Sequence, residues 1–264
     1  MPVHDDLGKR MKEFYEQVPK TRLIRRMPVM IRIDGKAFHT FTRGFQKPFD
    51  DILIKTMQET MKYLCENIQG CVFGYTQSDE ITLVLVDYKK LDSSAWFNYK
   101  VQKMCSISAS MTTMAFNNFF REQAAKWAIE YQEPHDDYYY KYCKIYNDAF
   151  NKAMFDSRCF NVPREEVTNF VYWRQLDATR NSIQMVGQAN FSHKQLQGKS
   201  CNMIQDMLFT EKGINWNDLP TVKKRGSACI KDAEGHWFID ENMPILKTTD
   251  KVDYRDYVDK LVDF

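Results

Sequence analysis

Apolar and polar positions alternate in blocks along the first part of the chain, and the blocks predict a strand followed by a helix. Residues 28–33 (PVMIRI) are rich in apolar and β-branched types and stop at an Asp-Gly pair, which predicts a short, largely buried strand that ends in a turn. Between residues 49 and 69, apolar side chains recur at steps of three and four, as on one face of a helix. Asp50 and Asp51 lie where negative charge favours the start of that helix.

Two further strand-like runs follow at 71–76 and 81–88, and the residues between them suit a hairpin. Downstream, the pattern predicts a long helix from Ser94 to about 131 with Ser93 or Ser94 as its cap, a strand at 158–163, helices at 164–187 and 192–212, and a hairpin from 226–232 and 236–241. Residues 135–155 show no clear period and receive no prediction.

The predicted order of elements fixes the fold class. The order β-α-β-β-α-β is the ferredoxin-like pattern, so the class is α+β with additional C-terminal helices and a hairpin. The chain has no internal repeat and no flexible linker. We therefore expect a single body over residues 1–264, with a core at about 27–190 and a C-terminal extension at 191–264 packed on it.

Composition and charge exclude several classes of protein. Of the 264 residues, 44% are hydrophobic and 27% are charged, as in an ordinary globular domain. The net charge of +2 is too low for a passive nucleic-acid coat, so any polyanion must meet a local basic patch. The charged N-terminus and the lack of about 18 consecutive apolar residues predict a cytoplasmic protein without signal peptide or membrane span. The seven scattered cysteines never form C-x-x-C, which favours reduced thiols over disulfides or structural zinc.

Two aspartates are the candidates for chemistry. Asp34 ends the first strand and Asp79 lies at the tip of the hairpin, and these places adjoin in a sheet of the predicted order. Two carboxylates beside a glycine suit Mg²⁺, which takes one or two carboxylates and fills its other positions with water and phosphate oxygens. Paired metal ions can clamp the attacking and leaving oxygens of a displacement at phosphorus, which predicts a two-metal nucleotidyl transfer site. A common Asp-Gly turn and a solvated hairpin corner are the structural alternative.

Three segments carry a family resemblance: residues 30–50 (MIRIDGKAFHTFTRGFQKPFD), 74–85 (GYTQSDEITLVL) and 172–183 (YWRQLDATRNSI). In residue identity, order and spacing, these segments resemble the motifs of the tRNA(His) guanylyltransferase superfamily. The resemblance implies a polymerase-like palm, similar to cyclase cores, in a homotetramer. It also implies nucleotide addition to the 5′ end of tRNA in the 3′→5′ direction, with two Mg²⁺ ions and ATP activation of the 5′-monophosphate. The implied partners are tRNA, ATP, GTP and other nucleoside triphosphates.

The resemblance assigns roles to individual residues. Asp34 and Asp79 look like metal-binding carboxylates, with the Gly35 carbonyl as a further ligand and Glu80 beside them as a catalytic residue. Arg174 is implied to meet substrate phosphates. The residues implied in nucleotide binding are Arg32, Lys36, Ala37, Phe38, His39, Lys47 and Ser78. Packing is the alternative role for His39 and for Trp173.

One segment departs from the family pattern. Enzymes that add a single guanosine to tRNA(His) continue after YWRQ with an H-I-N-N signature, where this chain has Thr179-Arg180-Asn181-Ser182. Only Asn181 is retained, and we carry it over as a contact to RNA. The departure resembles the guanylyltransferase-like branch, whose members repair 5′-truncated tRNAs by copying the opposite strand. Guanosine addition to tRNA(His) is the alternative, and a nucleotidyl cyclase or a non-enzymatic RNA-binding module fits less well.

RNA also requires a basic surface, because phosphate contacts position a nucleic acid without reading its sequence. The best candidate is the run Lys223, Lys224 and Arg225. Further candidates are Lys20, Arg22, Arg25, Arg26, Lys194 and Lys199. For any single lysine, a solvated surface position is the alternative. The methionines at 104, 111 and 114 are expected in the core.

Overall fold

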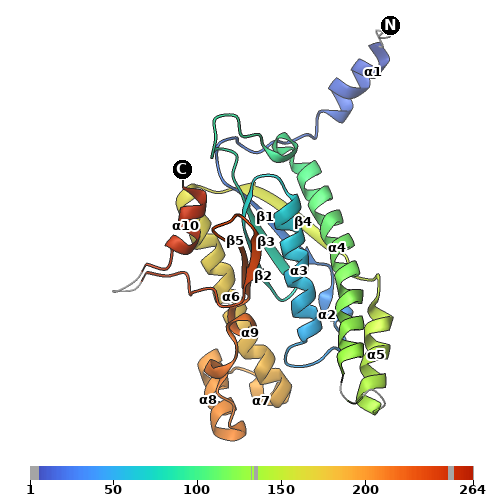
Figure 1. Ribbon diagram of the computed structural model, residues 1–264, viewed down its shortest axis with the longest axis vertical. Coiled ribbons are helices and arrows are strands. Elements are labelled where there is room, and N and C mark those ends of the chain that lie inside the picture. Colours follow the sequence, from blue (N-terminus) through green and yellow to red (C-terminus); the bar gives the residue numbers. More distant parts are fainter. Residues whose placement is uncertain (1–5, 132, 134–135, 249–252, 264) are drawn as a thin grey trace.

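A computed structural model describes residues 6–131, 133, 136–248 and 253–263, and a six-stranded antiparallel sheet forms its centre (Figure 1). The strands lie in the order β4-β1-β3-β2-β5-β6. Their bounds are β1 Val29–Gly35, β2 Cys71–Gln77, β3 Glu80–Leu85, β4 Phe155–Asn161, β5 Ser227–Lys231 and β6 Trp237–Asp240. Because β1 pairs with both β3 and β4, its end is held from two sides.

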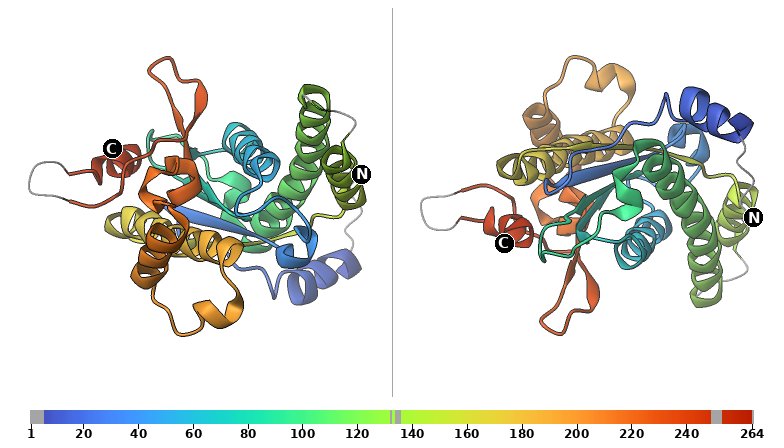
Figure 2. Two further views of the ribbon diagram at one scale, coloured as in Figure 1. Left: turned by 90° about the horizontal axis from the view of Figure 1, so that it is seen from below. Right: turned by 90° about the horizontal axis from the view of Figure 1, so that it is seen from above.

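Helices cover both faces of the sheet (Figure 2). The covering helices are α3 Asp51–Asn67 and α4 Val101–Glu130 on one face, and α6 Arg164–Asn190 and α10 Asp256–Val262 on the other. Ile31 and Ile33 join the core under α3 and α4, whereas Met30 joins the core under α6. Side chains alternate along a strand, so Arg32 and Asp34 share the α6 face with Met30.

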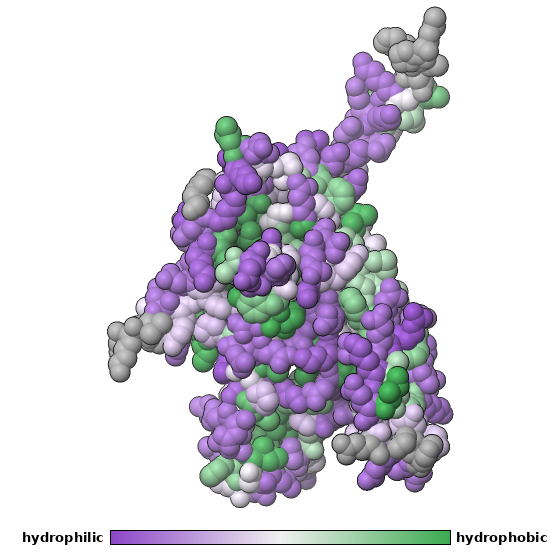
Figure 3. All heavy atoms as spheres, in the orientation of Figure 1, coloured by the Kyte–Doolittle hydropathy of each residue, from purple (hydrophilic) through white to green (hydrophobic). Residues whose placement is uncertain are grey.

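The remaining elements frame this layered body. They are α1 Asp6–Met11, the π-helix η1 Lys12–Glu16, α2 Phe38–Phe41, the 3₁₀ turns η2 Trp96–Tyr99 and η3 Trp216–Asp218, α5 Asp137–Ala149, α7 His193–Leu196, α8 Cys201–Lys212 and α9 Thr221–Arg225. The helix α1 projects away from the body (Figure 1). At the opposite end, the surface is hollowed between the lobe of α7 and α8 and the end of α4 and α5 (Figure 3). Within the described part of the chain, no helix is long and apolar enough to cross a membrane.

The predicted mixture of helices with an antiparallel sheet is confirmed, and several predicted elements lie where the pattern put them. Strand β1, helix α3 and the hairpin of β2 and β3 agree with the predicted ranges within a few residues. Asp50 caps α3, because its carboxylate accepts a hydrogen bond from the Leu53 N–H at 3.0 Å. The C-terminal hairpin is also found, and β5 extends the sheet by pairing with β2.

The start of the long helix was predicted wrongly. The backbone is left-handed at Phe97, Asn98 and Tyr99 within η2, so the right-handed helix α4 begins only at Val101. Neither Ser93 nor Ser94 caps it. The Ser93 hydroxyl instead accepts from the Lys90 N–H, and the Ser94 hydroxyl accepts from Gln69.

The apolar stripe of α4 is also narrower than predicted. Met104 is fully buried, but Met114 is about half exposed. Two of the buried positions of α4 are polar, Ser108 and Thr112, and their hydroxyls donate to carbonyls four residues earlier and so need no water. The Ser108 hydroxyl is also hydrogen-bonded to the Ser157 hydroxyl at 2.7 Å, which joins α4 to β4.

Three other elements differ from the sequence prediction. The predicted helix at 192–212 is divided into α7 and α8 around Gly198, whose φ of +75° is left-handed. The strand β4 begins at Phe155, three residues before the predicted start. The segment without a prediction contains α5, which packs against α4 through Tyr146 and Phe120.

Candidate active site

Asp34 and Asp79 meet at one end of the sheet. The Gly35 N–H donates to the backbone carbonyl of Asp79 at 3.1 Å, which ties the end of β1 to the hairpin tip. Both aspartates line a cavity of about 500 Å³, a size typical of ligand sites. The hairpin tip is a two-residue turn of Ser78 and Asp79, with Ser78 in the left-handed region at a φ of +51°.

The electrostatics of this pair favour a cation. Burial raises the pKa of Asp79, the nearby Asp34 and Glu80 carboxylates raise it further, and a hydrogen bond from the Ser78 hydroxyl at 3.0 Å opposes them. Among the described residues Asp79 has no ion pair, and the arginine nearest to Asp34, Arg158, is 3.9 Å away. Two carboxylates with so little compensation, next to backbone carbonyls, are a donor set that fits Mg²⁺.

The turn after β1 depends on glycine. A Cβ at Gly35 would lie 2.2 Å from the Phe38 ring, so only glycine lets this ring fold back against the strand end. Phe38 is buried among Phe41, Phe116 and Phe155, which fixes the turn to the core.

The residues predicted to contact the nucleotide lie in different places. His39 and Lys47 are exposed and line the cavity with the two aspartates. Ala37 lines it too, with a left-handed φ of +53°. The Lys36 side chain is instead exposed at a neighbouring hollow beside α5, and its N–H donates to the Met154 carbonyl at 2.8 Å.

Asp50 forms a wall of the same cavity, a role that sequence reasoning missed. Its buried carboxylate accepts from the Gln46 N–H at 3.0 Å and from the Tyr146 hydroxyl at 2.8 Å, besides capping α3. Burial raises the pKa of Asp50, and these hydrogen bonds oppose the shift. The contacts hold the loop that carries Lys47. In the sequence, Asp50 was predicted only as a negative charge that favours the start of a helix.

Glu80 lies beside the aspartates but is held by arginines. It pairs with Asp34 across β1 and β3, is nearly fully buried, and contacts Arg32 at 2.7 Å and Arg174 at 2.6 Å. Both carboxylate oxygens are therefore engaged by guanidinium groups. Arg174 is itself buried and contacts Asp177 at 2.9 Å. Sequence reasoning expected Arg32 and Arg174 at phosphates and missed this network, because it joins residues 94 positions apart.

Three predicted RNA contacts from the C-terminal part of the chain line a second, smaller hollow next to the first. Asn181, Lys223 and Lys224 border this space of about 80 Å³ together with Ser78. Lys223 forms an ion pair with Asp51 at 2.7 Å. Burial lowers the pKa of the Lys224 ammonium group.

Arg225 is held by the fold rather than exposed. It is half-buried, its carbonyl accepts from the Tyr75 hydroxyl at 2.6 Å, and burial lowers the pKa of its guanidinium group. Ser182, one of the residues that depart from the family signature, is buried beside this run. Its hydroxyl donates to the Lys223 carbonyl at 2.7 Å and accepts from the Trp216 indole at 3.0 Å.

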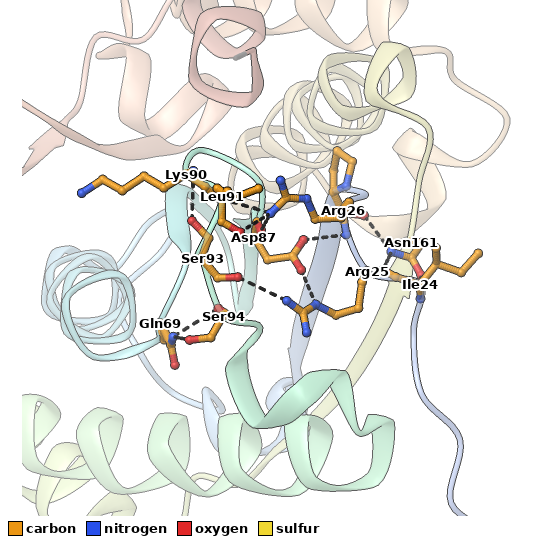
Figure 4. Close-up of polar contacts among 11 residues, drawn as sticks. Ile24, Arg25, Arg26, Gln69, Asp87, Lys90, Leu91, Ser93, Ser94 and Asn161 are labelled. Atoms are coloured by element: carbon orange, nitrogen blue, oxygen red, sulfur yellow. Dashed lines mark hydrogen bonds and ion pairs between the residues drawn. The ribbon is translucent and has the colours of Figure 1, made fainter.

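Two predicted members of the basic surface serve the fold instead. Arg25 and the Arg26 N–H both bind the buried carboxylate of Asp87, and the Arg26 guanidinium donates to carbonyls of the loop after β3 (Figure 4). Asn161 of β4 braces the same segment through Ile24 (Figure 4).

The other residues predicted for the basic RNA surface differ in whether their charge is paired or exposed. Lys20 contacts Glu16 at 2.7 Å, whereas Arg22, Lys194 and Lys199 are exposed.

Arg158 is the cation nearest to Asp34, and sequence reasoning missed it. Strand β4 sets Arg158 opposite Arg32 and Asp156 opposite Asp34, so all four side chains lie on one face of the sheet. Arg158 is half exposed and contacts Asp156 at 3.1 Å. The position of Arg158 near Asp34 follows from the register of β4 against β1, and the sequence alone does not reveal that register.

The family model for tRNAHis guanylyltransferase matches residues 8–163, more than half of the chain. The chain belongs to the tRNA(His) guanylyltransferase family. This confirms the sequence-based resemblance, and by class the chain is a nucleotidyltransferase. Among curated relatives, tRNA(His) guanylyltransferase of Saccharomyces cerevisiae is 28% identical over 220 residues, which cover 78% of this chain and 83% of that protein.

Solved structures of the family share the fold. A bacterial tRNA(His) guanylyltransferase-like protein in complex with ATP is 44% identical, with a TM-score of 0.83 over 98% of this chain and 100% of that one. A bacterial guanylyltransferase-like protein in complex with GTP is 38% identical, with a TM-score of 0.74 over 98% and 100%. The yeast guanylyltransferase is 25% identical, with a TM-score of 0.60 over 82% and 91%.

Proposed function

We propose that this guanylyltransferase family member adds nucleotides to the 5′ end of tRNA in the 3′→5′ direction, with the opposite strand as template. The observation that carries the proposal is that Asp34 and Asp79 line one cavity at the end of the antiparallel sheet. Two further observations support the guanylyltransferase-like branch. The similarity to the bacterial guanylyltransferase-like protein is greater than that to the yeast guanylyltransferase, and Ser182 stands where the single-guanosine enzymes have asparagine.

The chemistry requires two displacements at phosphorus. First, an oxygen of the RNA 5′-monophosphate attacks the α-phosphorus of ATP, which forms a 5′-adenylylated RNA and releases pyrophosphate. The 3′-hydroxyl of the incoming nucleotide then attacks the RNA 5′-phosphorus, and AMP leaves. Two Mg²⁺ ions held by Asp34, Asp79 and the Gly35 carbonyl would stabilise the negative charge that develops on the attacking and leaving oxygens.

The side chains around the aspartates suit the handling of a triphosphate. Lys47 and His39 line the same cavity as the two aspartates, where they can contact phosphate oxygens. Ser78 borders both this cavity and the second hollow, so its hydroxyl can contact a bound nucleotide. The related bacterial structures hold ATP and GTP, which supports the proposal that both nucleotides bind here.

The remaining parts of the proposal concern the whole molecule. We place the catalytic core at about residues 27–190, with residues 191–264 as an extension packed on it, in a cytoplasmic homotetramer. Sedimentation of the purified protein would measure the number of subunits.

The test is an addition assay. Purified protein with Mg²⁺, ATP and all four nucleoside triphosphates is given a tRNA that lacks its first residue. Growth of the 5′ end that follows the opposite strand is expected, and Asp79→Ala should lose both adenylylation and addition while its circular dichroism stays native. Asp92→Ala, which removes an exposed loop carboxylate, is the matched control and should remain active. Activity of either kind in Asp79→Ala would refute the assignment.

Addition of a single guanosine to tRNA(His) is the second candidate, and the 28% identity to the yeast enzyme favours it. The same assay separates the two functions. Guanosine added to full-length tRNA(His), with no growth on the truncated tRNA, would support the second candidate against the first.

A further inference from the structure

Trp173 lies on the surface of α6, although the positions around it in the sequence are buried. Its side chain is 50% exposed, whereas Val171, Arg174 and Gln175 are buried. One and two helical turns further along the same stripe, Leu176 is 49% exposed and the Arg180 side chain 62% exposed. The indole and Leu176 therefore present adjoining apolar side chains on the exposed stripe of α6, where a ligand can cover them.

The indole ring is fixed in place by its neighbours. The guanidinium carbons of Arg174 and Arg32 lie 4.6 and 5.8 Å from the ring centroid. Phe170 meets the ring edge-on at 5.4 Å between centroids. Both arginines form ion pairs with the buried Glu80, so the groups that contact the ring are themselves held by the fold. A rigid aromatic ring with cations around it is the type of surface on which nucleobases stack.

The ring lies beside Arg32 and outside the nucleotide cavity. Arg32 and Asp34 are two residues apart on one face of β1, which corresponds to about 7 Å between their Cα atoms. The cavity is lined by Asp34 and by the C-terminal part of α6, and neither Arg32 nor Trp173 borders it. Asp34 therefore borders the cavity, whereas the arginine-flanked indole lies outside it, next to the preceding residue on the same face of β1.

Arg158 adds positive charge on the open side of this surface. It is half exposed, faces the same side of the sheet as Arg32, and approaches Asp34 to 3.9 Å. A strand whose 5′-phosphate reaches Asp34 would therefore pass an exposed guanidinium before it meets the ring.

We propose that Trp173 is the stacking surface for the 5′-terminal nucleobase of the RNA substrate, and that Arg158 contacts the adjoining phosphate. The inference rests on the proposed function, because it takes the RNA 5′ end to lie at Asp34 and Asp79. It assigns the two surfaces to different substrates: the cavity binds the nucleoside triphosphate, and the surface of Trp173 binds the RNA.

The experiment compares Trp173→Ala, Trp173→Phe and the wild type in binding to a 5′-monophosphorylated tRNA transcript and, separately, to ATP. Loss of one stacked base costs about 1–3 kcal/mol, so the RNA dissociation constant of Trp173→Ala should rise about 5- to 150-fold while that for ATP stays unchanged. Trp173→Phe retains an aromatic face and should restore most of the RNA affinity. Phe209→Ala, which removes an exposed aromatic ring of α8, is the matched control and should bind as the wild type does.

A second measurement does not depend on the alanine variant. RNA should quench tryptophan fluorescence in the wild type more than in Trp173→Phe, and ATP should quench both equally. Unchanged RNA affinity in Trp173→Ala, an equal loss of ATP affinity, or a change of oligomeric state with RNA affinity retained would each overturn the inference. RNA binding that depends on Trp173 in a protein without 5′ addition would refute the proposed function alone, whereas 5′ addition with no such dependence would refute only the stacking surface.

Discussion

Replacement of Glu80 by alanine should strongly destabilise the protein, because it leaves a buried arginine without its main partner. Glu80 contacts Arg174 at 2.6 Å and Arg32 at 2.7 Å, and the side chains of Glu80 and Arg174 are only 5% and 6% exposed. Removal of one partner of such a buried pair costs about 3–5 kcal/mol. Arg174 keeps its contact with Asp177, which favours the lower end, about 3 kcal/mol. In a chain of this size, that corresponds to a fall in Tm of about 6–12 °C.

The assay is thermal and urea unfolding followed by circular dichroism. Asp156→Ala is the matched control, since it breaks the Arg158–Asp156 ion pair, in which the side chains are 52% and 57% exposed, and should cost under about 1 kcal/mol. The double variant Glu80→Leu with Arg174→Met removes the unpaired buried charge and should recover part of the loss. A loss below about 1 kcal/mol in Glu80→Ala would show that the pair is hydrated or mobile in solution and would refute this reasoning.

Two further substitutions test the walls of the site. Asp50→Ala should lower the free energy of unfolding by about 3 kcal/mol in a urea titration, because it removes the cap of α3 and leaves the Tyr146 hydroxyl without its acceptor, whereas Asp50→Asn should cost less. An equal loss in both variants would contradict the capping argument. Ser182→Ala should cost about 1–3 kcal/mol and change the tryptophan emission, because the buried Trp216 indole and the Lys223 carbonyl both lose their partner. Unaltered emission and stability would show that water replaces the hydroxyl.

The local pattern predicted the elements that carry the two aspartates. The apolar run of β1, the periodicity of α3 and the short hairpin were readable because each depends on residues close in sequence. Once these elements pair in the ferredoxin-like order, the ends that carry Asp34 and Asp79 adjoin, as the Gly35 to Asp79 hydrogen bond shows. The break before α4 was not readable in the same way, because the left-handed backbone at Phe97 and Asn98 has no signature in the apolar pattern.

The partners of the charged side chains were decided by the tertiary structure alone. Periodicity indicates which face of an element a residue occupies, but an ion pair depends on which distant element packs there. Arg25 binds Asp87 and Arg174 binds Glu80 across 62 and 94 positions, so residues that suggested an RNA surface or a phosphate contact became part of the fold. The same packing left Trp173 exposed. The sequence by itself thus determined the chemical groups and the strand ends that bear them, whereas only the folded chain decided which charges are neutralised internally and which remain for a substrate.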